Sequence, residues 1–520
     1  MKRPTSGRRL ALAVVFGGCV ALAGLAAARP GGLFGLPSLP EFGRSLVARV
    51  IAPLQKAPAP ARTQRSSSAR AAVAPASRGR AHPKDPMTTR DDSGLLRTFT
   101  RSGTIDHDNV FFQPIGSNGR SCDSCHRQEA AWGLTPREVR ARFDTTAGMD
   151  PLFRKNDGSN APNLDMSTVA ARRKAYSMLL SRAVIRVGIG IPANAEFTLA
   201  DVDDPYHYAS ASELSLFRRP LPSTNLAFLT GIMWDGRETI TPFLPPMHAG
   251  QANAALVEAL IKQASDATIG HAEGLDPTPE QLADIVAFES GLTTAQVRDD
   301  EAEFLNDDDA IGGPRTLAIQ RFHVGINDTL GGDPTGSLFD PDTMGLFPAW
   351  KGADAHDQSR RALARASIAR GEALFNDHPL TITGVGGLND ALGKPSIPGT
   401  CSSCHDSPNV GNHSVALPLN IGLSDASRRT PDMPLYTLRN NSTGKTVKTT
   451  DPGLALITGK WKDIGRFKGP VLRGLAARPP YFHNGFAPTL MDVVNFYDTR
   501  FAMHLTARQK RDLAAFLRAL

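Results

Sequence analysis

The residues of this chain best suited to chemistry are two pairs of cysteines, each followed directly by a histidine. The two patterns lie at residues 122–126 and 401–405 and read CDSCH and CSSCH. Thiols spaced in this way can each add to a vinyl group of a haem, and the following imidazole can then bind the iron. We therefore expect two covalently bound haem c groups, attached through Cys122, Cys125, Cys401 and Cys404, with His126 and His405 as the proximal iron ligands.

Other uses of paired cysteines fit this sequence poorly. A disulfide framework would not place a histidine after each pair, and the chain has only five cysteines, too few for a further cysteine-rich zinc site. The fifth, Cys19, lies in an apolar amino-terminal segment. The pattern thus favours haem attachment over disulfides or zinc.

Composition indicates a protein of more than one domain. The chain has 520 residues, of which 41% are hydrophobic and 21% charged, as in ordinary globular proteins. Its net charge of +7 is concentrated in the first hundred residues. Because the basic excess lies in a tail, binding to nucleic acid is not indicated.

The amino terminus is typical of an exported protein. Basic residues precede an apolar run from Leu10 to Ala28, so residues 1–28 are predicted to be a signal peptide or a membrane anchor. Residues 29–94 are rich in Ala, Pro, Arg and Ser, and we expect a disordered, low-complexity linker there. Since haem is attached to c-type proteins outside the cytoplasmic membrane, we expect a periplasmic location, with a possible membrane tether.

Two internal repeats divide the rest of the chain into halves. Capping boxes at residues 278–281 and 506–509 each open an apolar helical pattern, and the segments MWDGR at 233–237 and FHNGF at 482–486 correspond. We predict an N-terminal domain at 95–291, an irregular connector at 292–359 and a C-terminal domain at 360–520. Because strand signals are scarce, the predicted fold is mainly α, with two cytochrome c-like haem domains in tandem and irregular insertions.

Four stretches resemble the bacterial di-haem cytochrome c peroxidases and their MauG-like relatives. They are FFQP at 111–114, MWDGR at 233–237, RGEALF at 370–375 and the long run at 467–497. The resemblance covers roughly residues 95–125, 215–275 and 365–520. Residues 130–210 and 292–359 have no counterpart in it and are identified as insertions.

The resemblance implies different roles for the two haems. The haem held by His126 would react with peroxide, and the haem held by His405 would pass electrons or store an oxidising equivalent. Trp234 occupies the position of a tryptophan that lies between the two haems, where it would bridge them electronically or only pack at the interface. His483 would contact a haem propionate or a residue that holds an iron ligand, and would not bind the iron itself.

The second axial ligand of the haem at His405 separates the subtypes of this family. Peroxidases have a Met at the position of Tyr497, whereas MauG-like members have a Tyr there. A phenolate stabilises higher oxidation states than a thioether does. Tyr497 is therefore the candidate axial ligand, with a packing role for Tyr497 and ligation by Met503 as the alternative.

Cleavage of peroxide requires a group that moves a proton above the iron. The resemblance implies that this group is a Glu ten residues after the Gln of a Gln-Ala pair, and for Gln263-Ala264 that position is Glu273. His271 lies two residues earlier as a second candidate, either as acid and base or as a displaceable iron ligand. A surface loop is the alternative for both. The family's inter-haem calcium ion would bind carbonyl groups of Arg478 and Pro480, together with Asn225.

Three functions remain open at this stage. The first is a peroxidase that reduces hydrogen peroxide with electrons from a small periplasmic cytochrome c or cupredoxin. The second is a MauG-like or rubber-oxygenase-like oxidase of a protein or organic substrate, and the third is a non-catalytic electron-transfer protein. The resemblance favours the first. The sequence leaves the electron donor and the oligomeric state undetermined.

Overall fold

The computed structural model describes residues 87–239 and 254–520, all within one compact unit, Ser45–Leu520. The predicted signal or anchor at 1–28 and most of the predicted linker at 29–94 lie outside the described residues. The end of that linker is structured, because Thr88–Arg90 forms strand β1. No helix in the two described ranges has the length and apolar character needed to cross a membrane.

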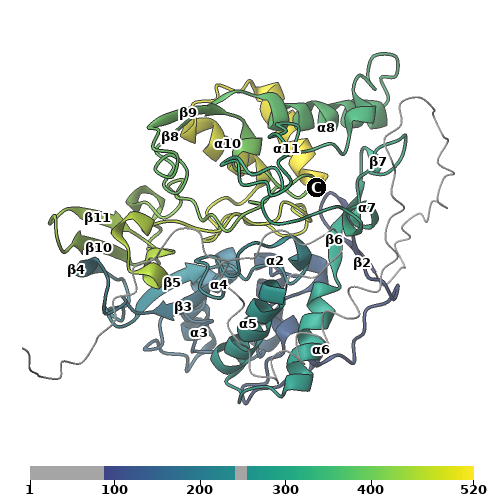
Figure 1. Ribbon diagram of the computed structural model, residues 1–520. Coiled ribbons are helices and arrows are strands. Elements are labelled where there is room, and N and C mark those ends of the chain that lie inside the picture. Colours follow the sequence, from purple (N-terminus) through teal and green to yellow (C-terminus); the bar gives the residue numbers. More distant parts are fainter. Residues whose placement is uncertain (1–86, 240–253) are drawn as a thin grey trace, which may run out of the picture. The chain divides into compact units, whose positions relative to one another are not determined.

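Helices and short strands alternate along the described residues (Figure 1). The helices that precede residue 300 are α2 (Pro136–Thr146), α3 (Val169–Ala175), α4 (Ser177–Arg182), α5 (Ala254–Ala272) and α6 (Pro279–Ser290). Those that follow are α7 (Pro314–Ala318), α8 (Arg360–Asp377), α9 (Ala455–Thr458), α10 (Leu490–Arg500) and α11 (Ala507–Arg518). Short 3-10 turns lie between them: η1 (Val110–Phe112), η2 (Cys122–Ser124), η3 (Gln128–Ala130), η4 (Leu226–Phe228), η5 (Pro348–Trp350), η6 (Cys401–Ser403), η7 (Ala426–Arg428) and η8 (Trp461–Asp463).

Both predicted capping boxes are confirmed. Gln281 N donates to Thr278 Oγ1 over 3.3 Å while the Gln281 side chain accepts from Thr278 N at 2.8 Å. Thr506 and Gln509 make the same pair of bonds at 2.9 and 3.3 Å. These bonds satisfy amide groups that the first turn of α6 and α11 would otherwise leave free.

Several small antiparallel sheets accompany the helices, so the prediction of a mainly α fold is not confirmed. Their strand orders are β1-β2-β6-β7, β11-β10-β4, β3-β5 and β8-β9. The strands besides β1 are β2 (Gly94–Phe99), β3 (Ile185–Ile189), β4 (Phe197–Asp203), β5 (Leu214–Arg218), β6 (Thr293–Asp299), β7 (Glu303–Phe304), β8 (Leu380–Thr383), β9 (Ser396–Gly399), β10 (Leu435–Asn440) and β11 (Thr446–Thr449). Most of these strands are short, and β4 pairs with a strand more than two hundred residues away, which local sequence patterns do not reveal.

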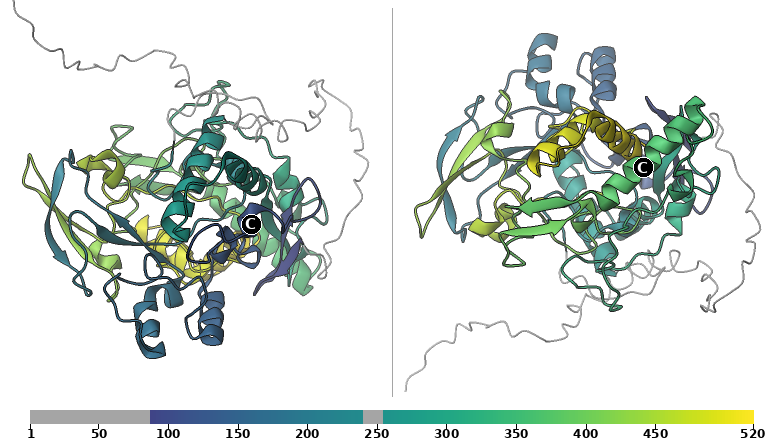
Figure 2. Two further views of the ribbon diagram at one scale, coloured as in Figure 1. Left: turned by 90° about the horizontal axis from the view of Figure 1, so that it is seen from below. Right: turned by 90° about the horizontal axis from the view of Figure 1, so that it is seen from above.

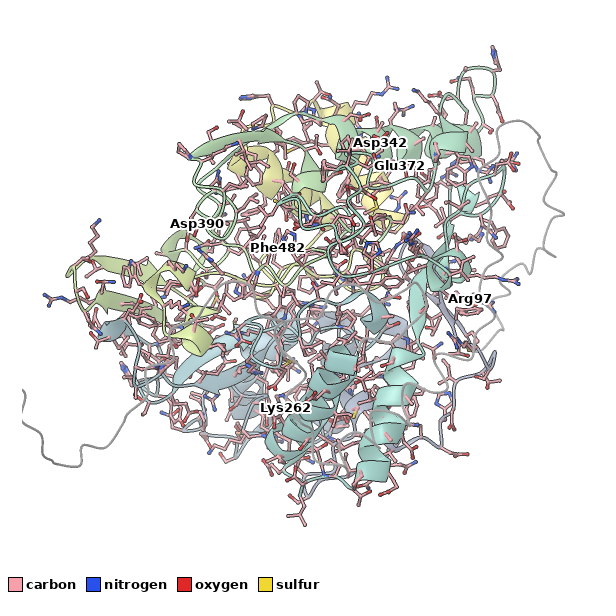
Figure 3. All side chains as sticks on the ribbon, viewed as in Figure 1. Arg97, Lys262, Asp342, Glu372, Asp390 and Phe482 are labelled. Atoms are coloured by element: carbon pink, nitrogen blue, oxygen red, sulfur yellow. The ribbon has the colours of Figure 1, made fainter. Side chains whose placement is uncertain are left out.

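The largest hydrophobic cluster surrounds α8, α10 and α11. Helices α8 and α11 pack closely (Figure 2), and Gly371 makes this possible, because a Cβ there would lie 2.0 Å from the carbonyl oxygen of Asp512. The segment predicted as an irregular connector adds Phe347 and Trp350 to this core. It is fastened to α8 by Glu372 (Figure 3), whose carboxylate accepts bonds from Leu346 N at 2.6 Å and Phe347 N at 2.9 Å.

A buried ionic network joins segments from both halves of the chain. Arg218 at the end of β5 donates to Asp451 at 2.7 and 2.9 Å and also binds Asp235. The side chains of these three residues are at most 4% exposed. Because a buried charge is costly unless it is paired, this network fixes the turn at residues 233–236 against the C-terminal half.

Candidate haem sites

The two cysteine motifs form matching 3-10 turns. In η2 the amide of Ser121 donates to Ser124 Oγ over 3.1 Å, and in η6 the amide of Thr400 donates to Ser403 Oγ over the same distance. The cysteines of both turns are free thiols. Each turn therefore presents its two thiols and the following histidine from one short, capped segment, as haem attachment requires.

Both histidines are oriented through one ring nitrogen. His126 Nδ1 lies 3.1 Å from the carbonyl oxygen of Trp132 and 3.1 Å from Ser223 Oγ, while His405 Nδ1 lies 2.6 Å from the carbonyl oxygen of Gly411. Burial lowers the pKa of His126 to about 4 and also lowers the pKa of His405. Neutral imidazoles held through Nδ1 leave Nε2 as the donor atom for a metal.

Each turn opens onto a large cavity, and the two cavities share a wall. The first is lined by Cys122, Cys125 and His126, and the second by Cys401, Cys404 and His405. Trp234 lines both of them, which is the placement predicted for a residue between two haems. The other residues that line both cavities are Arg219, Pro220, Pro222, Lys468, Pro470 and Arg478.

The cavity walls carry enclosed cations without acidic partners. Burial lowers the pKa of Lys468 to about 8, of Arg219 and Arg473 to about 9 and of Arg478 to about 10. None of these four makes an ion pair with an acidic side chain of residues 87–239 or 254–520. Uncompensated charges in such surroundings are unfavourable, so an anionic ligand fits here. Haem propionates meet this need, and the cavities, thiols and cations together fit two c-type haems.

Trp234 is held firmly in the shared wall. Its indole Nε1 donates to the carbonyl oxygen of Arg219 over 2.8 Å, and its own carbonyl oxygen accepts from Lys468 N at 2.9 Å. The neighbouring Asp235 belongs to the buried ionic network with Arg218. This position between the cavities suits either a bridging or a packing role, so the bridging role stays a prediction.

The two candidates for proton transfer are placed differently. His271, in the last turn of α5, lines the first cavity with its side chain 37% exposed. Glu273 has left the helix with φ of 53°, is exposed and is not among the residues that line the cavity. The end of α5 at Ala272 thus turns Glu273 outward, and His271 is the candidate that reaches the first cavity.

Tyr497 on α10 faces the histidine of the second motif. Its ring centroid lies 6.4 Å from that of His405, with the rings at 74°, and both residues line the second cavity. The phenol lies among Phe482, Phe496 and Phe501, and burial raises its pKa. Met503 lines the same cavity, so both predicted axial candidates lie there.

His483 is buried beside Trp234 and lines the second cavity. Its ring stacks on Phe467 with centroids 3.9 Å apart, and its centroid lies 6.3 Å from that of Trp234. Neither ring nitrogen has a hydrogen-bond partner among the described side chains and backbone. Such an orphaned imidazole fits the predicted role as a partner of a haem substituent.

Of the residues predicted to bind calcium, Asn225 has its side chain engaged elsewhere, and the calcium site stays a prediction. Asn225 uses its amide oxygen to accept from Thr294 N and its amide nitrogen to donate to Thr294 O, both at 2.9 Å. The Arg478 carbonyl oxygen accepts from Arg219, and Pro480 lies in the wall of the second cavity. Within the described ranges no group of three His, Cys, Asp or Glu side chains could hold a metal ion.

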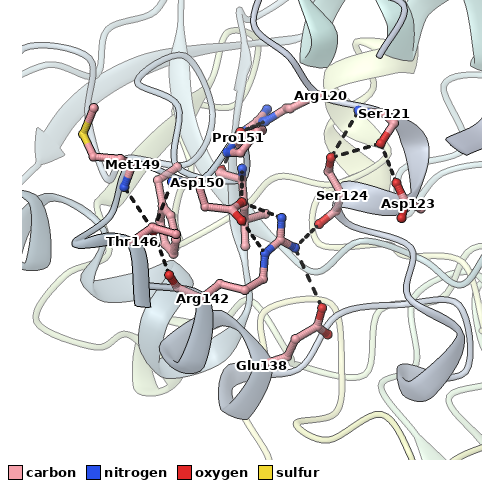
Figure 4. A network of polar contacts seen from close by, with 12 residues as sticks. Arg120, Ser121, Asp123, Ser124, Glu138, Arg142, Thr146, Met149, Asp150 and Pro151 are labelled. Carbon is pink, nitrogen blue, oxygen red and sulfur yellow. Dashed lines mark hydrogen bonds and ion pairs between the residues drawn. The ribbon is translucent and has the colours of Figure 1, made fainter. Parts of the chain in front are cut away.

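The insertion at 130–210 supports the first haem-binding turn. Arg142 on α2 donates to the carbonyl oxygen of Ser124 over 2.7 Å and is braced by Asp150 at 2.5 and 3.1 Å (Figure 4). Cys125 packs against the hydrophobic cluster of this insertion, which contains Phe143. The region that has no counterpart in the family resemblance therefore positions a predicted haem attachment site.

Sequence reasoning missed several polar residues of the cavities. Asp157, Arg120 and Glu289 line the first cavity, and His413 lines the second. Burial raises the pKa of Glu289 to about 8, and its Oε1 has no described hydrogen-bond partner. These residues belong to no local motif, so no signal in the sequence marked them.

Comparison with known proteins confirms the resemblance inferred from the motifs. No protein-family profile matches the chain. It is 30% identical over 140 residues to the cytochrome-c peroxidase IdrP1 of Pseudomonas sp. (strain SCT), covering 23% of this chain and 36% of that protein. It is 28% identical over 193 residues to IdrP1 of Denitromonas iodatirespirans, covering 34% and 44%. The chain thus matches less than half the length of these curated relatives, and within the matched region it is related to cytochrome-c peroxidases.

Two solved structures align with a larger part of the chain, but their structural similarity to it is low. A MauG-like protein associated with microbial copper homeostasis is 16% identical, covering 83% of this chain and 93% of that chain, with a TM-score of 0.35. A variant of the diheme peroxidase BthA from Burkholderia thailandensis is 17% identical, covering 84% and 95%, with a TM-score of 0.27.

Proposed function

We propose that this protein is a periplasmic di-haem c-type peroxidase that reduces hydrogen peroxide with electrons from a small cytochrome c or cupredoxin. The observation that carries the proposal is the pair of cavities, each with its own thiol pair and histidine, that meet at Trp234. Two redox groups that share a wall suit the transfer of electrons from one site to the other. The sequence relationship to cytochrome-c peroxidases supports the same reaction.

The first cavity is the proposed site of peroxide reduction. A haem bound there supplies an iron that binds peroxide and accepts or releases electrons. His126 would hold this iron through Nε2, because its Nδ1 is engaged by Trp132 O and Ser223 Oγ. His271 would take a proton from one oxygen of the bound peroxide and return it to the other, which would leave as water.

The shared wall is the proposed electron path. The Trp234 indole lies between the cavities and is fixed by its bond to Arg219 O. Arg219, Lys468 and Arg478 line both cavities and are positioned to bind propionates from either side. Pairing with carboxylates would stabilise these enclosed cations and fix both haem planes relative to the indole.

A MauG-like oxidase of a protein or organic substrate is the second candidate. It is favoured by Tyr497, whose ring faces His405 across the second cavity. A phenolate ligand at that position would stabilise a more oxidised haem, which suits storage of an oxidising equivalent better than rapid electron delivery. Peroxide activation in the first cavity is common to both candidates.

The test uses the full-length protein produced in a host that attaches haem c. Two covalent haems, a high-spin ferric signal in the EPR spectrum and peroxide-dependent oxidation of a reduced small cytochrome c are expected. Trp234→Phe should slow oxidation of the second haem in stopped-flow mixing with peroxide, whereas Trp461→Phe, at a tryptophan that lines neither cavity, should not. A haem-free protein, or two irons that are both fully ligated and inert to peroxide, would exclude the peroxidase. Oxidation of an added organic substrate without turnover of the cytochrome would favour the oxidase.

A further inference from the structure

His271 is one end of a chain of polar contacts that reaches into the insertion at 130–210. Its Nδ1 lies 2.7 Å from Asp157 Oδ2. Arg120 follows, with Nη1 at 2.6 and 2.8 Å from the two oxygens of Asp157. All three residues line the first cavity, and two of them are nearly inaccessible, with the side chain of Asp157 8% exposed and that of Arg120 3% exposed.

Asp157 is held as a carboxylate. Its burial opposes ionisation, but the hydrogen bond to His271 and the positive charge of Arg120 outweigh this, so that the pKa of Asp157 lies below its ordinary value. Arg120 is itself fixed, because its Nε donates to Pro151 O over 2.9 Å (Figure 4) and its Nη2 donates to Leu152 O over 2.7 Å. The acceptor for His271 is therefore both charged and immobile.

A charged acceptor at Nδ1 determines which nitrogen of His271 is available. Nδ1 must carry a hydrogen to bond with the carboxylate, so in the neutral ring Nε2 is the unprotonated, basic nitrogen. The backbone of His271 is also fixed, since its carbonyl oxygen accepts from Asn118 Nδ2 at 2.8 Å and from Arg120 Nη1 at 3.0 Å. The ring thus has one defined tautomer and little freedom to turn.

We propose that Asp157, held by Arg120, positions His271 so that its Nε2 removes the proton from a weak acid that binds in the first cavity. The peroxide part of this inference rests on the proposed function. With hydrogen peroxide, the O–H bond of the near oxygen breaks and Nε2–H forms. The proton then passes to the far oxygen, the O–O bond breaks, and this oxygen leaves as water. Two electrons from the donor cytochrome or cupredoxin and two protons from solvent convert the remaining oxygen atom to a second water. Asp157 and Arg120 are positioning residues, and Asp157 keeps its charge while the ring is cationic.

Binding of cyanide to the ferric holoprotein tests this arrangement without turnover. Hydrogen cyanide must lose a proton to bind iron as an anion, so its association rate reports a base near the iron. Asp157→Asn keeps the shape of the side chain but removes its charge, and His271→Gln removes the base. Each is expected to slow cyanide association by about 10- to 100-fold, the range seen when partners of functional histidines are removed. Haem content and the ferric EPR spectrum confirm that the variants fold.

A double variant separates positioning from a structural role. If Asp157 acts through His271, Asp157→Asn has no further effect in the His271→Gln background. Asp144→Asn is the control, because Asp144 pairs with Arg173 in the same insertion but at the surface, with side chains 62% and 51% exposed. This variant should bind cyanide at the wild-type rate.

Three results would overturn the inference. These are a wild-type rate for Asp157→Asn, additive losses in the double variant, or a low-spin first iron that loses an axial nitrogen ligand in His271→Gln. If cyanide binding follows the expected pattern but the wild-type protein does not reduce peroxide, the proposed function fails and the positioning of His271 stands.

Discussion

The two cysteine motifs are alike in their local structure and unlike in the other side chains that line their cavities. In both, a short capped turn carries the thiols, and the histidine directs Nδ1 to the carbonyl oxygen of the sixth residue after it, Trp132 or Gly411. The first cavity is also lined by the polar group of His271, Asp157 and Arg120. Across the second lies Tyr497, surrounded by phenylalanines.

This difference indicates how one type of haem attachment can serve two purposes. A partly exposed imidazole backed by a carboxylate can take up and release protons, which peroxide cleavage requires. The aromatic rings around Tyr497 offer no such group, and an apolar environment of this kind suits electron storage and transfer. We therefore expect the two sites to differ in the chemistry that they support.

Removal of one thiol pair at a time is expected to have the largest effect. Replacing Cys122 and Cys125 by Ser should leave one covalent haem and abolish the reactions with peroxide and cyanide, because the open site is lost. Replacing Cys401 and Cys404 should also leave one haem but keep an iron that binds cyanide. Haem staining after denaturing electrophoresis and mass spectrometry measure attachment, with Cys19→Ser as the control. Peroxide reactivity without the first pair would reverse the assignment of the two sites.

Disrupting the buried ionic network between the halves should strongly reduce the free energy of unfolding. Asp451→Asn leaves Arg218 buried with less compensating charge, and loss of one partner of a buried pair typically costs about 3–5 kcal/mol. Urea unfolding of the holoprotein would measure this change in the free energy of unfolding. Asp92→Asn disrupts an ion pair whose side chains are 82% and 73% exposed and should leave stability almost unchanged. Equal stability of both variants would show that the halves do not depend on this network.

Exchange of the phenol for a thioether should make the second site more like an electron carrier. Tyr497→Met is expected to raise the reduction potential of the second haem by a substantial part of the roughly 0.8 V range that axial ligands cover. The first haem should keep its potential. Redox titration with optical detection measures both, and Tyr208→Phe, at a tyrosine that bonds Glu213, serves as the control. An unchanged potential in Tyr497→Met would assign Tyr497 a packing role.

The buried carboxyl group of the first cavity should make stability depend on pH. Because burial raises the pKa of Glu289 to about 8, the folded state retains this proton above the pKa of the unfolded chain, about 4.5. Its contribution to stability is therefore greatest at low pH and falls between about pH 4.5 and 8, by at most about 1.4 kcal/mol per pH unit. Glu289→Gln should remove this slope in urea unfolding at a series of pH values. A slope equal to that of the wild type would place the titrating group elsewhere.

Elements formed by neighbouring residues were predictable. The capping boxes of α6 and α11 depend on residues within a few positions of each other, and the structure has them as predicted. The two cysteine motifs are equally local and form matching turns, while haem attachment to them stays a prediction. The sheets were not predictable to the same degree, since β4 pairs with β10 and β2 pairs with β6 across long stretches of chain. Short strands gain their stability from such distant partners and not from their own composition.

The residues that line the two cavities were also only partly predictable from the sequence. Sequence spacing identified both His271 and Glu273, but only the end of α5 decided that His271 reaches the cavity and Glu273 points outward. Asp157 had no recognisable signal, because it lies in an insertion 114 residues before His271.

The sequence by itself determined the prediction of two haem attachment sites and of the atoms that would form them, because covalent attachment and proximal ligation need only five consecutive residues. The tertiary structure alone decided which cavity contains His271, which contains Tyr497 with its surrounding phenylalanines, and which residues line both cavities. Those properties depend on side chains from distant segments, and their charge and hydrogen bonding take effect only where folding brings them together.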